Sequence, residues 1–264
     1  MTSEKFEGAL VPFSHVLITR PRQESQQLAK LAATLGLSSI AMPAFEFHST
    51  ALSREAMSEL DQIPGNQRPL MIFTSPRSVE YGLPQVPAKL MAHAKVASIG
   101  ASTARCLSEA GISVAVRPSK GYGSEELLEA IKGSMEPSGS IKKAYVLTAP
   151  GGRAFLQEGL ESLGYETKLL MVYGKKPAEI TEADMNEIGV ASKMVVIWTS
   201  ANAMDALSKR LPSSAWLRIC QSEWLVVSER LKRLARAYGP KCIHIAPGPS
   251  NIDLAAALQS IVKN

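Results

Sequence analysis

Short runs of consecutive apolar residues alternate along this chain with longer stretches in which apolar residues recur every three to four positions. The apolar runs, typical of strands buried on both faces, lie at residues 16–19, 70–74, 96–99, 144–148, 195–199, 224–228 and 243–246. The periodic stretches, which predict amphipathic helices, lie at residues 23–35, 54–61, 102–110, 124–131, 153–163, 201–210, 229–238 and 251–261. Strands that alternate with helices predict parallel sheets and an α/β fold.

The pattern of the first half of the chain recurs in the second half. Phe73-Thr74-Ser75 returns as Trp198-Thr199-Ser200, and the two serines are 125 residues apart (200 − 75 = 125). Leu35-Gly36 and Leu163-Gly164 close two predicted helices at an offset of 128 residues (164 − 36 = 128). Glycine tolerates the left-handed conformation that ends a helix. A nearly constant offset predicts two similar α/β units with a binding site shared between them.

Composition and charge narrow the class of protein. With 264 residues, 45% of them hydrophobic, the chain is long enough for two domains with cores of their own. The formal charge of +5 arises from 29 basic and 24 acidic residues without a long run of like charge, and only 6% of residues are aromatic. Nucleic-acid binding is therefore not predicted, and a small anionic ligand fits the charge at least as well.

The cysteines indicate the compartment. Cys106, Cys220 and Cys242 are scattered, without a CxxC pair or a His/Cys cluster at metal-ligand spacing. Neither a disulfide framework nor a metal site is predicted, and a reducing cytoplasm is indicated. Residues 1–14 lack a signal segment and are expected to form a short flexible tail. No apolar run approaches the roughly 18 residues of a membrane span, so no membrane partner is expected.

Hydroxyl-bearing residues follow several of the predicted strands. Thr74-Ser75 and Thr199-Ser200 stand where a buried strand gives way to a helix, and Ser102-Thr103 opens the helix after residues 96–99. One interpretation is helix N-capping, in which the side-chain oxygen accepts a hydrogen bond from a backbone N–H. The other is a helix N-terminus that receives an anion through its free N–H groups and its dipole. Both can hold together, because a cap can also line the rim of a ligand pocket.

The segment Gly151-Gly152-Arg153 joins a predicted strand to a predicted helix. Its glycines allow close approach of the backbone, and its arginine suits a carboxylate or a phosphate. A tight turn without a ligand is an equal alternative. The segment lacks the Lys-Ser/Thr of a P-loop and the spacing of a dinucleotide fingerprint, so no nucleotide or nicotinamide cofactor is predicted.

Residues for acid–base catalysis are scarce. The four histidines occupy no context typical of a catalytic triad or a zinc protease, and His244, which alternates within a strand, is interpreted as structural. Tyr173 offers a hydroxyl donor in an extended segment, with packing as the alternative. Any chemistry is therefore expected to need little acid–base machinery from the protein.

Eight short motifs, in order along nearly the whole chain, carry a resemblance to a known family. They are Leu17-Ile18-Thr19-Arg20-Pro21, Phe73-Thr74-Ser75, Ile99-Gly100-Ala101-Ser102-Thr103-Ala104, Ser124-Glu125-Glu126-Leu127-Leu128, Gly151-Gly152-Arg153, Val172-Tyr173, Trp198-Thr199-Ser200 and Val227-Ser228-Glu229-Arg230-Leu231. In this order and spacing they resemble the uroporphyrinogen-III synthase family, whose members close hydroxymethylbilane into uroporphyrinogen III without a cofactor.

The resemblance implies an α/β fold of two similar domains, each a parallel sheet flanked by helices, joined by a two-stranded linker ladder. It places domain one at residues 15–40 and 176–264, and domain two at residues 48–168. The crossing strands would be residues 41–47 and 169–175. This agrees with the pattern of the sequence, because both segments contain longer extended runs than a core strand requires.

The implied substrate, hydroxymethylbilane, is a linear tetrapyrrole with many carboxylates, which suits a net-positive protein with many helix N-termini. The implied reaction loses the ring A hydroxyl to form an azafulvene and closes the macrocycle through a spiro intermediate, which inverts ring D. Because the azafulvene is intrinsically reactive, the enzyme's task is mainly to position the bilane and to block the uninverted closure. The resemblance implies a cytoplasmic monomer without a cofactor, in transient contact with the preceding deaminase.

Site residues follow from the resemblance position by position. Tyr173 matches the family's tyrosine that assists departure of the hydroxyl, which makes it the catalytic candidate. Glu229-Arg230-Leu231 stands where the first half has Ala101-Ser102-Thr103, so Arg230 is expected to bind a carboxylate; Arg20 is a second such arginine, with a salt bridge at a strand end as its alternative. The implied substrate-binding set is Arg20, Thr74, Ser75, Ser102, Thr103, Gly151, Gly152, Arg153, Thr199, Ser200, Ser228 and Arg230.

Two other classes of protein fit parts of the pattern. One is a two-lobed binding or sensor protein that closes around a small anionic ligand without chemistry; an export signal or a DNA-binding appendage would favour it, and the sequence shows neither. The other is a glycosyl- or phosphoryl-transferring α/β enzyme, which would need an acidic metal site or a nucleotide loop. Neither pattern occurs, so the synthase is favoured.

Overall fold

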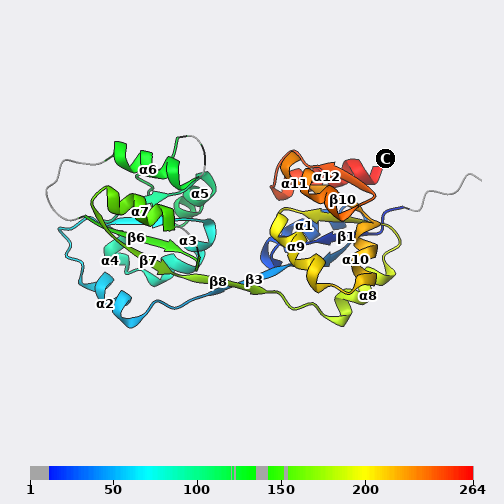
Figure 1. Cartoon of the computed structure of the whole chain (residues 1–264), viewed down its shortest axis with the longest axis horizontal. Coiled ribbons are helices and arrows are strands. Elements are labelled where there is room, and N and C mark those ends of the chain that lie inside the picture. Colours follow the sequence, from blue (N-terminus) through cyan, green and yellow to red (C-terminus); the bar gives the residue numbers. More distant parts are fainter. Residues whose placement is uncertain (1–11, 120, 122, 135–141, 152–153, 264) are drawn as a thin grey trace, which may run out of the picture. The chain divides into compact units, whose positions relative to one another are not determined.

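The computed structural model describes residues 12–119, 121, 123–134, 142–151 and 154–263. The chain divides into two compact units (Figure 1). Unit 1 comprises the described residues of Met1–Glu46 and Lys176–Asn264, and unit 2 comprises those of Phe47–Lys175. Each unit contains a parallel sheet flanked by helices, as the α/β prediction requires. In the described parts of the chain, none of the helices is long and apolar enough to cross a membrane.

Unit 1 is built on a five-stranded parallel sheet with the order β11-β10-β9-β1-β2. Its strands are β1 (His15–Ile18), β2 (Ser38–Ala41), β9 (Met194–Trp198), β10 (Glu223–Val226) and β11 (Cys242–Ile245). Its helices are α1 (Arg22–Ala33), α8 (Glu182–Val190), α9 (Ala201–Arg210), α10 (Ser213–Cys220), α11 (Glu229–Ala235), the short 3₁₀ helix η2 (Arg236–Tyr238) and α12 (Asn251–Lys263).

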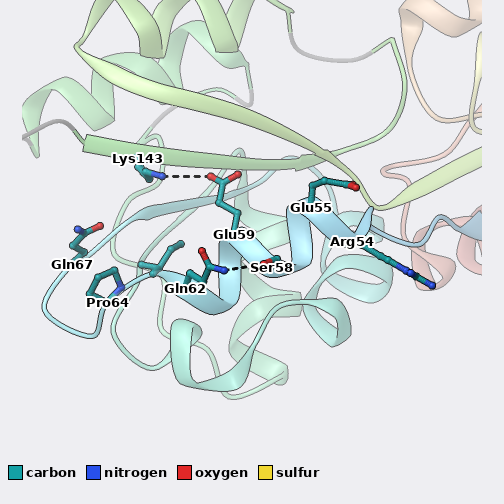
Figure 2. A pocket seen from close by; sticks show the side chains of 9 residues that line it. Arg54, Glu55, Ser58, Glu59, Gln62, Pro64, Gln67 and Lys143 are labelled. Carbon is teal, nitrogen blue, oxygen red and sulfur yellow. Dashed lines mark hydrogen bonds and ion pairs between the residues drawn. The ribbon is translucent and has the colours of Figure 1, made fainter.

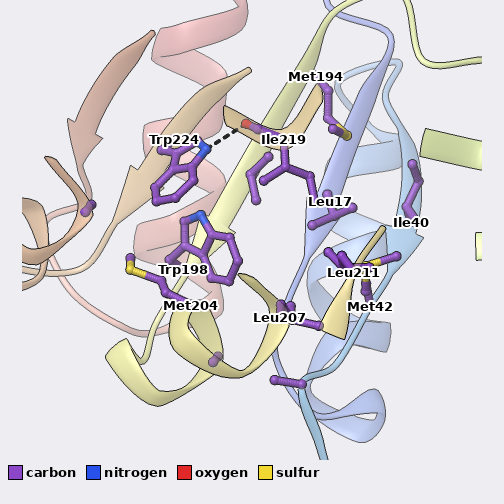
Figure 3. Close-up of a cluster of buried hydrophobic side chains, with 14 of the residues drawn as sticks. Leu17, Ile40, Met42, Met194, Trp198, Met204, Leu207, Leu211, Ile219 and Trp224 are labelled. Carbon is purple, nitrogen blue, oxygen red and sulfur yellow. Dashed lines mark hydrogen bonds between the residues drawn. The ribbon is translucent and has the colours of Figure 1, made fainter. Parts of the chain in front are cut away.

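Alternation along the central strand β9 explains why both faces of this sheet are covered. Val195 and Ile197 belong to a core that α1 and α12 complete. Val196 and Trp198 belong to the opposite core, which α8 to α11 complete. Figure 3 shows this second core, where the indole N–H of Trp224 donates to the Ile219 carbonyl at 2.8 Å. A strand apolar on both faces is buried in a parallel sheet, as its continuous run of apolar residues predicts.

Unit 2 is built on a four-stranded parallel sheet with the order β5-β4-β6-β7. Its strands are β4 (Leu70–Phe73), β5 (Lys95–Ser98), β6 (Lys142–Thr148) and β7 (Tyr165–Met171). Its helices are α2 (Arg54–Gln62), α3 (Pro76–Gly82), η1 (Leu83–Gln85), α4 (Ala88–Met91), α5 (Ala101–Glu109), α6 (Ser124–Gly133) and α7 (Ala154–Ser162). Helices α2 to α5 pack on one face of the sheet, and α6 and α7 pack on the other.

The chain passes between the units along two short strands that pair with each other, β3 (Phe45–Ser49) and β8 (Tyr173–Pro177). The extended runs predicted around them are each divided in the structure. Pro43, which has no N–H to donate, lies between β2 in the sheet of unit 1 and β3. Val172 lies between β7 in the sheet of unit 2 and β8. Each run therefore contributes first to a core sheet and then to the two-stranded ladder.

The internal repeat is visible in the order of the strands. Both sheets place their strands in the same spatial order, but the pair that comes first along the chain in unit 1 corresponds to the pair that comes last in unit 2. In unit 1, β1 and β2 precede β9 to β11; in unit 2, β4, β5 and a parallel bridge between Ala97 and Val116 precede β6 and β7. Gly36 before β2 has φ of 77°, and Gly164 before β7 has φ of 82°. At these left-handed residues the chain leaves a helix and enters the next strand, which is why glycine recurs at this point of each unit.

Candidate active site

The candidate site lies at the carboxyl edge of the unit 2 sheet. All its strands run in the same direction, so their carboxyl ends meet at one edge, which is where parallel sheets bind ligands. The predicted hydroxyls follow these ends: Thr74-Ser75 follows β4, and Ser102-Thr103 lies in the first turn of the helix after β5. Tyr173, at the start of β8, joins them from a distant part of the sequence.

Ser75 and Tyr173 form a hydroxyl pair. The Ser75 Oγ and the Tyr173 phenolic oxygen are 3.1 Å apart, and either atom can donate the hydrogen bond. Ser75 is also the N-cap of α3: its Oγ accepts the Ser78 N–H at 3.0 Å, and the Ser75 N–H donates to the Ser78 Oγ at 3.1 Å. The capping and ligand interpretations of Ser75 are therefore compatible, because the capping oxygen also contacts the phenol.

The ring of Tyr173 is held by aromatic neighbours. Its centroid lies 6.1 Å from that of Tyr81, in a stacked arrangement, and 6.2 Å from that of Phe47. The Arg77 guanidinium carbon lies 3.6 Å from the Phe47 ring centroid. Burial, and secondarily the Glu80 carboxylate, raise the pKa of Tyr81, although Arg77 opposes this. The ring of Tyr173 is packed and its hydroxyl has a polar partner, so the structure is compatible with both interpretations, and the catalytic role stays a prediction.

Among the described residues, the hydroxyl of Thr103 has no hydrogen-bond partner. The residue is only 1% exposed. It lies in the first turn of α5, whose N-cap is Gly100 and which has no side-chain cap. The neighbouring Ser102 is exposed. Since a buried hydroxyl without a hydrogen bond costs about 1–3 kcal/mol, this one calls for a ligand or an ordered water.

The Thr74 hydroxyl has a hydrogen-bond partner within the protein. Its buried Oγ1 donates to the Leu147 carbonyl of the neighbouring strand β6 at 2.9 Å. Thr19, which follows β1 in unit 1, makes the equivalent bond to the Ile197 carbonyl of β9 at 2.7 Å. Each threonine therefore ties together two neighbouring strands of its sheet where their backbone pairing ends. Thr19 is not among the predicted site residues, although its position after a buried strand matches that of Thr74.

The glycine segment is described only in part. Gly151 follows β6 in the left-handed region with φ of 75°, a conformation that favours glycine. Gly152 and Arg153, which were expected to bind an anion, lie outside the described residues. Their predicted role stays a prediction.

The unit 1 candidates occupy the equivalent edge of their own sheet. Ser200 is the N-cap of α9 without a side-chain cap hydrogen bond in the described chain, whereas the Ser228 Oγ accepts the Leu231 N–H at 3.2 Å and caps α11. Thr199 is half-buried and Arg230 is exposed. Ser228 thus fits the capping interpretation, and Ser200 keeps a hydroxyl that its own helix does not use.

Arg20 is engaged in a network at the end of β1. Its guanidinium donates to the Glu24 Oε2 at 2.7 and 3.0 Å, to the Pro249 carbonyl at 3.0 Å and to the Asn251 Oδ1 at 2.9 Å. These bonds tie the start of α1 to the start of α12. The salt-bridge alternative weighed for Arg20 is therefore present, and its binding role stays untested.

We expect Arg20→Met to lower the free energy of unfolding by about 1–2 kcal/mol, since it breaks charge-assisted hydrogen bonds between two helices. The half-saturating substrate concentration should change little. Arg230→Met is the matched control, because it removes an exposed arginine that was predicted to bind a carboxylate. Thermal melting measures the stability of both variants, and substrate saturation measures their half-saturating concentrations. Arg20 would be a binding residue after all if its variant kept full stability and lost affinity.

The described structure also has a cavity of about 680 Å³ beside α2, lined by none of the predicted site residues (Figure 2). Its Lys143 is the second residue of β6, so the cavity lies toward the amino ends of the strands, opposite the hydroxyls. Glu59, on the cavity wall, accepts hydrogen bonds from the Tyr145 hydroxyl at 2.7 Å and from Lys168. Burial acts to raise the pKa of Glu59, but these bonds and the two lysines outweigh it and lower the pKa.

This lowered pKa predicts a loss of stability in acid. A carboxyl whose folded pKa lies below its unfolded value stabilises the fold above the unfolded value, near 4.5, and loses that contribution as pH falls through the folded value. We therefore expect Glu59→Gln to destabilise the protein at neutral pH, and the difference from wild type to shrink below pH 4.5. Melting temperatures of both proteins across pH measure this. A difference independent of pH would contradict it.

Known proteins match most of this chain. A family model described as Uroporphyrinogen-III synthase HemD matches residues 26–256. The chain is similar to the uroporphyrinogen-III synthase of Escherichia coli (strain K12), with 27% identity over 251 residues that cover 92% of this chain and 99% of the relative.

Two solved structures resemble the chain. One is a mutant uroporphyrinogen III synthase from the extremely thermophilic bacterium Thermus thermophilus, with a TM-score of 0.57, 17% identity, and coverage of 95% of this chain and 98% of that chain. The other is the uroporphyrinogen-III synthetase from Helicobacter pylori, with a TM-score of 0.57, 17% identity, and coverage of 93% and 99%. At this identity the likeness concerns the fold, and it confirms the predicted α/β class.

Proposed function

Because the chain belongs to the uroporphyrinogen-III synthase family, we propose that it closes hydroxymethylbilane into uroporphyrinogen III with inversion of ring D, and that the Ser75–Tyr173 pair assists the first step. The family match and the curated relative make it an enzyme of tetrapyrrole biosynthesis. The alternative of a sensor without chemistry is not favoured. The reaction class, a cyclising loss of water, is part of the proposal.

The observation that carries the site proposal is the 3.1 Å contact between the Ser75 and Tyr173 hydroxyls. When the C–O bond of the ring A hydroxymethyl group breaks, the oxygen needs a proton to leave as water. The Ser75 Oγ already accepts the Ser78 N–H, so its own proton can be donated to the phenolic oxygen. In that arrangement the phenol O–H of Tyr173 is left to donate to the departing hydroxyl.

The second support is the buried hydroxyl of Thr103, which has no hydrogen-bond partner in the part of the chain that the structure describes. We propose that Thr103 and Ser102, in the first turn of α5, bind a substrate carboxylate where the helix dipole also favours negative charge. The remaining predicted binding residues belong to the same proposal, except Thr74 and Arg20, whose donors are engaged within the protein. Ser75 and Ser228 are kept, because their oxygens only accept in the helix caps and their own protons are not used there. The residues that remain are Ser75, Gly151, Gly152, Arg153, Thr199, Ser200, Ser228 and Arg230.

The proposal includes catalysis without a cofactor, because loss of water and ring closure transfer no electrons and the azafulvene reacts without further activation. Positioning then supplies most of the rate. The three free thiols fit a reducing, cytoplasmic setting. A transient contact with the deaminase that supplies the bilane is also proposed.

The rate of ring closure tests whether the protein is an enzyme rather than a binding module. Hydroxymethylbilane is generated from porphobilinogen by its deaminase, and cyclic product is followed with and without the chain. We expect closure to be faster than the spontaneous reaction and proportional to catalytic amounts of the chain. Saturable binding of the bilane with closure at the spontaneous rate would assign the protein to the sensor class.

A further inference from the structure

Three side chains of different chemistry meet on one face of the unit 1 sheet. Glu223 begins β10, and Cys242 and His244 lie on the neighbouring strand β11. One ligand atom from each, a carboxylate oxygen, a thiol sulfur and an imidazole nitrogen, lies within 4.8 Å of the other two. Glu223 and Cys242 are the first residues of their strands, and the proposed active site lies in unit 2, so the cluster is separate from it.

The sheet itself holds this cluster together. In the parallel register Glu223 pairs with Cys242 and Leu225 pairs with His244, so residues two apart on β11 flank the glutamate on the same face. The intervening pair, Trp224 and Ile243, belongs to the core on the other face. The His244 Nε2 lies 2.8 Å from the Glu223 Oε2. The three groups are therefore brought together by backbone pairing and do not depend on a flexible loop.

We infer that Glu223, Cys242 and His244 form a binding site for a divalent ion of the zinc type, such as Zn²⁺ or Co²⁺. Thiolate, imidazole and carboxylate are the donors that Zn²⁺ takes in proteins, whereas Mg²⁺ and Ca²⁺ prefer oxygen alone. Three protein ligands leave the fourth tetrahedral position to water, which suits a site where Cys242 is exposed. Zinc-to-ligand distances of about 2.0–2.3 Å can be met by small rotations of side chains already this close.

The ammonium group of Lys193 lowers the affinity of the proposed site for a cation. Its nitrogen lies 3.4 Å from the Glu223 Oε1, where it neutralises the carboxylate, and it also lies 3.7 Å from the Phe13 ring centroid. A divalent ion must displace or repel this ammonium. Lys193→Met should therefore tighten binding, which is the opposite of what loss of a ligand does. A merely adventitious thiol adduct would not respond to Lys193.

Cobalt titration of the full chain without a histidine tag tests the site. Bound Co²⁺ reports a cysteine ligand through its thiolate charge-transfer band and a tetrahedral geometry through its visible absorption. We expect one equivalent of Co²⁺ to develop both signals. Cys242→Ser should abolish the charge-transfer band, and Glu223→Gln and His244→Gln should each weaken affinity roughly tenfold or more. Zn²⁺ should displace Co²⁺, and Mg²⁺ should not.

Cys106→Ser, a change in unit 2, is the matched control and should leave the titration unchanged. The proposal is overturned if equimolar Co²⁺ gives no charge-transfer band or if the band survives Cys242→Ser. It is also overturned if Cys242→Ser alone has an effect while the glutamine variants and Lys193→Met leave affinity unchanged, because that result describes a lone thiol. Circular dichroism checks that each variant is folded. Lys193→Met keeps all three proposed ligands, so a change in its affinity reports the charge of Lys193 and not the loss of a ligand.

Discussion

Tyr173→Phe should lower turnover by roughly ten- to a thousandfold while the half-saturating substrate concentration stays nearly constant, since only a group acting on the departing hydroxyl is lost. The ring contacts with Tyr81 and Phe47 remain. Because the bilane also loses its hydroxyl spontaneously, residual activity should persist. The remaining product should still be mainly the type III isomer, since other contacts set the folding of the substrate. Steady-state kinetics with isomer analysis measure all three quantities.

Tyr145→Phe is the matched control, because it removes another phenol of unit 2 that lies away from the hydroxyl edge and donates to Glu59. It should cost stability and leave turnover intact. Ser75→Ala should lower turnover too, and should add less than its full effect to Tyr173→Phe if the two hydroxyls act as a unit. Wild-type turnover in Tyr173→Phe would reduce Tyr173 to a packing residue.

Thr103→Val should lower activity by about tenfold without a loss of stability, and this separation is the second large effect that we expect. Valine fills nearly the same volume, and the hydroxyl that it removes is buried and has no partner in the described chain. The folded protein therefore loses no internal bond and is relieved of a desolvated group. The substrate loses a hydrogen bond, which appears as a higher half-saturating concentration or a lower turnover.

Thr74→Val is the matched control, because it removes a hydroxyl that is also buried but has a partner, the Leu147 carbonyl. That variant should lose about 1 kcal/mol of stability and keep its kinetics. If Thr103→Val instead loses stability and keeps full activity, its hydroxyl serves the fold, and the proposed carboxylate contact at α5 is withdrawn.

Local pattern predicted most of the strands and the repeat because both follow from short-range physics. Runs such as Val195 to Thr199 can be buried on both faces only in a parallel sheet, and glycines such as Gly36 and Gly164 stand where the backbone must take a positive φ. Four helices were not predicted. Of these, α3 and α4 are seven and four residues long, and α10 follows α9 after Leu211 and Pro212. The fourth, α8, has nine residues but buries only Ile188, so it offers no apolar periodicity to recognise.

The spacing of residues along the sequence does not predict contacts that depend on the tertiary structure. The Ser75–Tyr173 pair joins residues 98 apart, so the sequence offered Tyr173 as a hydroxyl donor but did not connect it with Ser75. Glu223 and Cys242 are likewise joined by strand register, so a search for metal-ligand spacing could not find them. Whether a hydroxyl has a partner, which separates Thr74 from Thr103, depends on a neighbouring strand that the local sequence does not specify.

The isomer composition of the product tests the central claim most directly. Porphobilinogen is converted by its deaminase in the presence of increasing amounts of the chain, and the oxidised products are separated as the type I and type III isomers. Inversion of ring D requires that the type III fraction rise to nearly all of the product as the chain becomes saturating. Type I alone at saturating protein would contradict the proposed function, whatever the rate of closure.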